Sequence, residues 1–150
     1  MEAITFVVPA IPIAQPRPKA RAFAGHAQIY EADKSHPVHA FKASVRHAAA
    51  EAYQGAPLEC PLYVSLLFVF PRPANKRWKK RPMPREWCPK KPDCDNLIKS
   101  CLDAMNGLTF ADDSQVVAMD LTKFVAAGDE QPHVVVRIRE ALSIAESCGF

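Results

Sequence analysis

The sequence contains no long uninterrupted apolar run, although 49% of its 150 residues are hydrophobic. A membrane-spanning helix needs about 20 consecutive apolar residues, and no stretch approaches that length. The first residues, MEAITFVVPAIPIAQP, carry no basic segment ahead of their apolar part, so we expect no secretory signal peptide. These absences exclude an ordinary membrane protein and favour one soluble domain, residues 1–150, with its own core.

Paired cysteines are also missing. The five cysteines form no C-x-x-C motif and their number is odd, which is typical of reduced thiols, and we therefore expect a cytoplasmic protein. The five histidines are scattered along the chain, so neither residue type has the spacing of a tetrahedral zinc site. No internal repeat or second-domain boundary is visible.

The charge is unevenly distributed. Segment 72–91 holds nine Lys or Arg and one acid, a local balance of +8, whereas the other 130 residues hold ten basic and fifteen acidic residues, a balance of −5. A basic segment on a mildly acidic body predicts a loop that faces a polyanion, and a solvated loop without a partner is the alternative. The candidate DNA contacts are Arg72, Lys76, Arg77, Lys79, Lys80, Arg81, Lys90 and Lys91.

Hydrophobic periodicity predicts an α/β (α+β) domain in which a small mixed sheet packs against two main helices. Residues 12–37 hold four prolines and predict a long loop, with a short hairpin around Gly25. Ser35 is expected to cap the first helix, with Pro37 in its first turn. Segment 72–91 predicts a proline-rich loop or flap, and the last ten residues leave a short helix undecided. The predicted strands are 4–8, 62–70, 116–125 and 133–138, and the predicted helices are 37–54 and 93–106.

The helix predicted at 93–106 follows the stretch KPDCDN and has two different faces. Asp95, Lys99 and Asp103 recur at intervals of four, so they form a stripe along its exposed side. An ordinary structural explanation is available: Asp93 or Asp95 can cap the helix, for about 1 kcal/mol, and the stripe can form surface ion pairs. The opposite arc is apolar and is expected to face the core: Cys94, Leu97, Ile98, Cys101, Leu102 and Met105.

A second acidic pair, Asp112–Asp113 in GLTFADDSQVV, makes a metal site the alternative to capping. An EF-hand is excluded, because positions 6 and 12 counted from Asp93 are Ile98 and Ala104 rather than glycine and glutamate. Carboxylates are the hard oxygen ligands that Mg²⁺ prefers, and such clusters serve phosphoryl transfer. The helix separates the two acidic pairs by about 20 Å. A shared site therefore needs a dimer, an irregular return of the chain, or a helix that starts later.

The stretch KPDCDNLIKSCLDAMNGLTFADDSQV closely resembles the signature of the RusA-type Holliday junction resolvases of bacteria, phages and prophages. The shared pattern is Asp-x-Asp-Asn-Leu-x-Lys, then Asp-Ala, then an Asp-Asp-x-Gln-Val segment. The match is dense across 91–117, and the first strand, the PRPKAR segment, IYE and the helix after it resemble the family more loosely. The basic insert and the tail after Glu140 depart from the shortest members.

The resemblance implies a RusA-like homodimeric endonuclease that uses Mg²⁺, with Mn²⁺ as the alternative. Such an enzyme resolves four-way DNA junctions by paired symmetric nicks in recombination and repair. By motif position, Asp93, Asp95 and Asp113 would hold the metal, and Lys99 would be the catalytic lysine. Supporting roles fall to the further acidic positions of the pattern, Asp103 and Asp112.

Elementary physics agrees with a branched-DNA partner. A four-way junction has approximate twofold symmetry, which suits a twofold dimer, and segment 72–91 supplies contacts to phosphates. Trp78 and Trp87 either stack on exposed bases at a branch point or anchor the loop. Two further hypotheses remain: a non-catalytic DNA-binding module, and a nuclease for flap or other branched DNA or for RNA. No membrane partner is expected.

Overall fold

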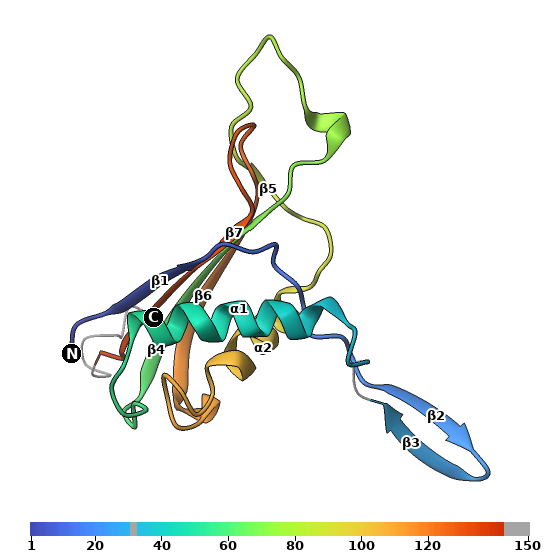
Figure 1. The fold of residues 1–150 in the computed structure, drawn as a ribbon, viewed down its shortest axis with the longest axis vertical. Coiled ribbons are helices and arrows are strands. Elements are labelled where there is room, and N and C mark those ends of the chain that lie inside the picture. Colours follow the sequence, from blue (N-terminus) through green and yellow to red (C-terminus); the bar gives the residue numbers. More distant parts are fainter. Residues whose placement is uncertain (31–32, 143–150) are drawn as a thin grey trace, which may run out of the picture.

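One mixed five-stranded sheet organises the chain. The computed structural model describes residues 1–30 and 33–142 (Figure 1). The strand order is β1-β7-β4-β6-β5, and every neighbouring pair is antiparallel except β4 and β6, which are parallel. This is the α+β arrangement that the sequence predicts, a mixed sheet with two helices. The strands are β1 (Ile4–Val8), β4 (Leu62–Phe70), β5 (Glu86–Trp87), β6 (Val116–Val125) and β7 (His133–Glu140).

The parallel pair determines where the functional segments lie. Parallel strands cannot be joined by a tight hairpin and need a long crossover. Here the chain leaves the end of β4, forms segment 72–91, then helix α2 (Cys94–Met105), and only then returns as β6. Figure 1 shows segment 72–91 rising beyond one end of the sheet together with the turn between β6 and β7.

Helices α1 (Pro37–Ala52) and α2 pack together. The core joins their apolar faces to alternate residues of β4, whose Leu62, Val64 and Phe68 are fully buried. Alternate residues of a strand point to opposite faces of the sheet, so both helices cover one face. The other face carries half-buried side chains such as Ser65.

Two local expectations before α1 have different outcomes. The hairpin around Gly25 is confirmed as β2 (Lys19–Phe23) and β3 (His26–Tyr30), with a positive φ of 80° at Gly25. The cap at Ser35 is wrong: His36 is the N-cap, and its Nδ1 accepts a hydrogen bond from the Val38 amide at 3.1 Å. A proline at the first helical position, Pro37, moves the cap to the residue directly before it.

The second helix is confirmed to within one residue at each end, since the predicted ends Asp93 and Asn106 are its caps, and Gly107, with a φ of 73°, follows the C-cap. The inward placement of Cys94 is wrong, because this side chain is exposed. Cys94 is the first residue of α2, and the buried face begins only at Leu97. Across residues 1–30 and 33–142, no helix is both long and apolar enough to cross a bilayer. Most of the tail considered for a short helix, residues 143–150, lies outside the described residues.

Candidate active site

Asp93 and Asp95 stand at the N-terminal end of α2 with their carboxylates free of the helix backbone. Asp93 occupies the N-cap position, but its side chain makes no capping hydrogen bond. The side chains of Asp93 and Asp95 are 52% and 71% exposed. A capping aspartate accepts a bond from an amide of the first turn, so capping does not explain why this pair is acidic. Both carboxylates are accessible to a ligand from solvent.

Arg17 shows that the two carboxylates lie side by side. One of its nitrogens, Nη2, lies 3.6 Å from Asp93 Oδ2 and 3.9 Å from Asp95 Oδ2. The segment before it is fastened to the helix, because the amide of Gln15 donates to the carbonyl of Asn96 at 2.9 Å. Arg17 itself is 72% exposed, so these ion pairs are weak and a metal ion or phosphate can displace them. Only the PRPKAR resemblance gave any sequence signal for this neighbour.

Lys123 of β6 holds the segment that leads into the site. Its Nζ donates to the carbonyls of Lys90 (2.6 Å) and Pro92 (2.7 Å). These two bonds fix residues 90–92, which lead directly into Asp93. The strand after α2 therefore does return beside the start of the helix, but it brings a lysine there rather than an acid. No spacing in the sequence pointed to Lys123.

Lys99 and Asp103 lie farther along the same helix and form an ion pair. Lys99 Nζ is 3.6 Å from Asp103 Oδ2, and Lys42 of α1 reaches the same oxygen at 3.6 Å. Asp103 is 29% exposed and Lys99 is 62% exposed. Asp103 thus joins the two helices, and its supporting role in the site stays a prediction, while the Lys99 ammonium remains open to solvent one turn after Asp95.

Asp112 and Asp113 behave differently from each other. Asp112 caps a short 3₁₀ turn (Asp113–Gln115): its Oδ1 accepts from the Ser114 amide at 2.8 Å, and its own amide donates to Gln115 Oε1 at 2.8 Å. The hydrogen bonds from Ser114 hold the pKa of Asp112 below its ordinary value. Asp112 is therefore a structural cap. Asp113 is half-buried and borders a shallow hollow of about 430 Å³ with Leu102.

The three predicted metal ligands do not meet within one chain. Asp93 and Asp95 stand at the start of α2, whose twelve residues at about 1.5 Å each make it about 18 Å long, and Asp113 follows its other end. Across residues 1–30 and 33–142, no group of three His, Cys, Asp or Glu side chains is close enough to hold a metal ion. The pair Asp93–Asp95 fits Mg²⁺, which keeps several waters and needs few protein ligands. Asp113 of the same chain does not complete it.

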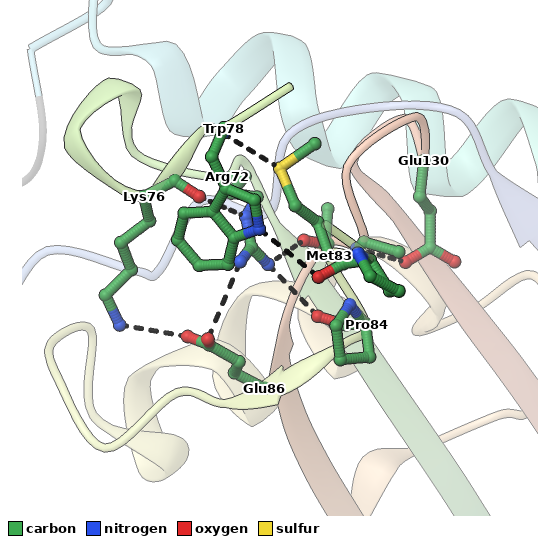
Figure 2. A network of polar contacts seen from close by, with 10 residues as sticks. Arg72, Lys76, Trp78, Met83, Pro84, Glu86 and Glu130 are labelled. Atoms are coloured by element: carbon green, nitrogen blue, oxygen red, sulfur yellow. Dashed lines mark hydrogen bonds and ion pairs between the residues drawn. The ribbon is translucent and has the colours of Figure 1, made fainter. Parts of the chain in front are cut away.

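Arg72 organises the basic arm, residues 72–91, from the inside. Its side chain is only 2% exposed, so its guanidinium is out of reach of a DNA phosphate in this conformation. A buried guanidinium must bind its donors within the protein, and this one ties together three separate parts of the chain (Figure 2). It donates to the carbonyl oxygens of Lys76 (2.7 Å), Pro84 (3.0 Å) and Ala126 (3.2 Å).

Two acids complete the framework of the arm. The Glu86 carboxylate lies 3.0 Å from Lys76 Nζ and 3.5 Å from Arg72 Nη2, and the hydrogen bond from Lys76 lowers the pKa of Glu86. Arg85 donates to both carboxylate oxygens of Glu130, the shortest contact being 2.6 Å, and these bonds lower the pKa of Glu130. Because Glu130 lies between β6 and β7, the arm is fastened to the sheet.

The other cations of the arm face solvent. Lys76 is half-buried and paired with Glu86, so it has less freedom to contact a ligand. The remaining six predicted DNA contacts are all exposed. They are Arg77, Lys79, Lys80, Arg81, Lys90 and Lys91.

A comparison with protein families matches residues 9–139 to the model described as Endodeoxyribonuclease RusA. The chain belongs to this family of endodeoxyribonucleases. It is 32% identical over 145 residues to the uncharacterised protein YqaN of Bacillus subtilis (strain 168), covering 93% of this chain and 98% of YqaN. It is also 32% identical over 97 residues to a protein of Lactococcus phage r1t named crossover junction endodeoxyribonuclease, covering 61% of this chain and 67% of that protein.

Membership of the RusA family favours a metal-binding role for the acidic residues at the start of α2. RusA-type nucleases generally depend on a divalent metal, and the exposed carboxylates at the start of α2 are the ligand type that such a metal prefers. The match covers the basic arm and α2 together. This chain therefore contains both a candidate metal site, at the start of α2, and a candidate DNA-binding segment, the basic arm.

Proposed function

We propose that this RusA-family protein resolves four-way DNA junctions by paired symmetric nicks, as a Mg²⁺-dependent homodimer acting in recombination and repair, with Mn²⁺ as the alternative metal. The observation that carries the proposal is the exposed pair of carboxylates, Asp93 and Asp95, at one end of α2, where the Asp93 side chain makes no capping hydrogen bond. The phage relative's name supports the choice of a crossover junction as substrate. We expect the protein to act in the cytoplasm, where recombination occurs in bacteria.

The residues of the proposed active site divide the work. Asp93 and Asp95 would hold the metal, which when bound orients water and neutralises charge on the phosphate. The ammonium of Lys99, one turn along the same helix, would stabilise the negative charge that develops on the phosphate in the transition state. Arg17 balances the acids before substrate arrives, and its exposure lets it move to a phosphate oxygen instead.

Asp113 is proposed to act across a dimer interface. In a twofold dimer with its two α2 helices antiparallel, the end of one helix lies beside the start of the other. That arrangement would bring Asp113 of one subunit to the Asp93–Asp95 pair of its partner, and would form two equivalent sites. The apolar surroundings of Asp113 support a protein contact there, since nearby Val117 is 61% exposed. A helix that starts later than residue 94 is ruled out.

DNA binding is assigned mainly to the exposed cations of the basic arm. Arg72 ties the backbone of the arm to the end of β6, so the arm presents those cations from a folded segment. Contacts to phosphates give affinity and position without reading sequence, which suits recognition of a DNA shape. We leave Arg72 out of this set and give Lys76 a minor part.

Asp93→Asn tests the metal role. We expect loss of junction cleavage in Mg²⁺ with junction binding retained or improved, because a carboxylate that repels phosphate has been removed. Asp129→Asn is the matched control, since Asp129 is exposed in the turn between β6 and β7. Wild-type cleavage by Asp93→Asn would contradict the metal role of Asp93, whereas a wild-type protein that binds the junction without cutting it would support the alternative of a non-catalytic DNA-binding module. A substrate panel with flap DNA and RNA separates the remaining alternatives.

A further inference from the structure

The two tryptophans of the basic arm have opposite environments. Trp78 is half-buried, whereas Trp87 is 72% exposed. A tryptophan buries more area than almost any other side chain and is rarely left open to water. The contrast therefore separates one tryptophan that is packed within the arm from one whose ring is largely open to solvent.

Trp78 is held in place by contacts within the arm itself. The guanidinium of Arg72 lies 4.8 Å from its ring centroid and that of Arg81 lies 4.1 Å from it. Its indole Nε1 donates to the carbonyl of Pro82 at 3.2 Å, and its backbone amide contacts the sulfur of Met83 at 3.3 Å. Figure 2 shows the indole beside Arg72 and Met83. Trp78 therefore anchors the arm, with two guanidinium groups against its ring.

Trp87 has one face packed and the other open. Its ring stacks on Phe124, with centroids 4.9 Å apart and planes at 24°. Strand β5 pairs Trp87 with Phe124 in antiparallel register at the edge of the sheet. The guanidinium of Arg85 lies over the Phe124 ring, 5.4 Å from its centroid. The Trp87 ring stacked on Phe124 is called the platform below. An aromatic ring held by backbone pairing and by a stacked neighbour loses little further freedom when it binds a planar ligand.

The platform is also fixed relative to the candidate metal site. The amide of Cys88, directly after Trp87, donates to the carbonyl of Lys123 at 3.1 Å. The side chain of the same lysine holds the residue before Asp93. One residue of β6 thus connects the platform to the start of α2. The intervening chain carries two exposed cations, Lys90 and Lys91, where phosphates next to a stacked base can bind.

We infer that the open face of Trp87 stacks on an unpaired or end-exposed base at the branch point of the DNA substrate. Bases inside a linear duplex are stacked on both sides and offer no face, whereas a branch point exposes the faces of its terminal pairs. Stacking on an aromatic ring tolerates every base type. Trp87 therefore selects branched over linear DNA without reading sequence. This inference rests on the proposed function, since it specifies how the same substrate is recognised.

Binding of metal-free protein to a synthetic four-way junction and to a linear duplex of equal length tests the inference. Stacking contributes about 1–3 kcal/mol per base, so we expect Trp87→Ala to weaken junction binding about tenfold and duplex binding less than about twofold. Trp87→Phe should keep part of the selectivity. With 2-aminopurine at the branch point, wild type should quench its emission and Trp87→Ala should not. Sedimentation of each variant without DNA reports its oligomeric state.

Three results would overturn the inference. Unchanged junction affinity of Trp87→Ala would show that the platform is not used. Equal loss on both DNAs would make it a general contact rather than a branch-point contact. A change in oligomeric state would assign the open face to a second copy of the chain. Failure of the proposed function is distinguishable, because it appears in the wild type as equal affinity for junction and duplex or as no junction cleavage in Mg²⁺.

Discussion

The proposed division of one active site between two subunits makes a quantitative prediction about mixed dimers. Carboxylates that bind one Mg²⁺ ion at about 2.1 Å lie within about 5 Å of each other. In one chain, however, Asp93 precedes and Asp113 follows α2, a helix about 18 Å long, and among the described residues they form no group of three ligands. Asp93→Asn and Asp113→Asn should each abolish cleavage alone. A dimer that contains one subunit of each kind has one doubly substituted site and one intact site, because the intact site takes Asp93 from one subunit and Asp113 from the other.

The assay is nicking of a four-way junction by an equal mixture of the two variants, unfolded together and refolded so that subunits exchange. Random pairing makes about half of the dimers mixed, each with one intact site in two. We therefore expect about a quarter of the wild-type nicking rate, with single nicks in place of paired ones. An equal mixture of Asp93→Asn and Asp95→Asn is the control and should stay inactive, because both changes affect the same side of the site. Inactivity of the first mixture would refute a site shared between subunits.

Three further predictions concern the basic arm. Arg72→Met should lower the free energy of unfolding of the arm by about 3–5 kcal/mol, because it removes three charge-assisted hydrogen bonds made by a buried group. Faster amide hydrogen exchange in the arm alone would confirm this, and unchanged exchange would contradict it. Changing Lys79, Lys80 and Arg81 together to alanine should flatten the dependence of junction affinity on salt, by about 0.9 in log–log slope for each lost phosphate contact; an unchanged slope would place the DNA elsewhere. The pKa of Glu130 is lowered from its ordinary value of 4.5 by its arginine partner, so its contribution is present above pH 4.5 and is lost as the pH falls through the lowered value. The protection of the arm's amides from exchange should fall there. Glu130→Gln should remove only the part of that loss that Glu130 causes, because the pKa of Glu86 in the same arm is also lowered.

Much of the fold follows from local patterns in the sequence. The segment LYVSLLFVF is too apolar and too rich in β-formers for anything but a buried strand, and it became the central strand β4. The two helices and their apolar arcs follow from spacing alone. The predictions for Cys94 and Ser35 are wrong because both concern helix starts, where a shift of one residue decides whether a side chain packs, caps or faces solvent.

The site is harder to read from sequence, because its geometry depends on contacts between distant segments. Spacing identified the acids and Lys99, but Arg17 reaches Asp93 only because the N-terminal loop bonds to α2. The burial of Arg72 was equally invisible. In composition it is one basic residue among nine, and only the folded arm distinguishes it from its exposed neighbours. The same holds for Trp78 and Trp87.

Cleavage of a synthetic four-way junction by the wild-type protein in Mg²⁺, beside a linear duplex of the same sequence and an EDTA control, tests the central claim most directly. We predict paired nicks at symmetric positions on two opposing strands of the junction, little cutting of the duplex, and none in EDTA. Equal cutting of the duplex, or cutting that persists in EDTA, would contradict a metal-dependent enzyme that recognises branched DNA.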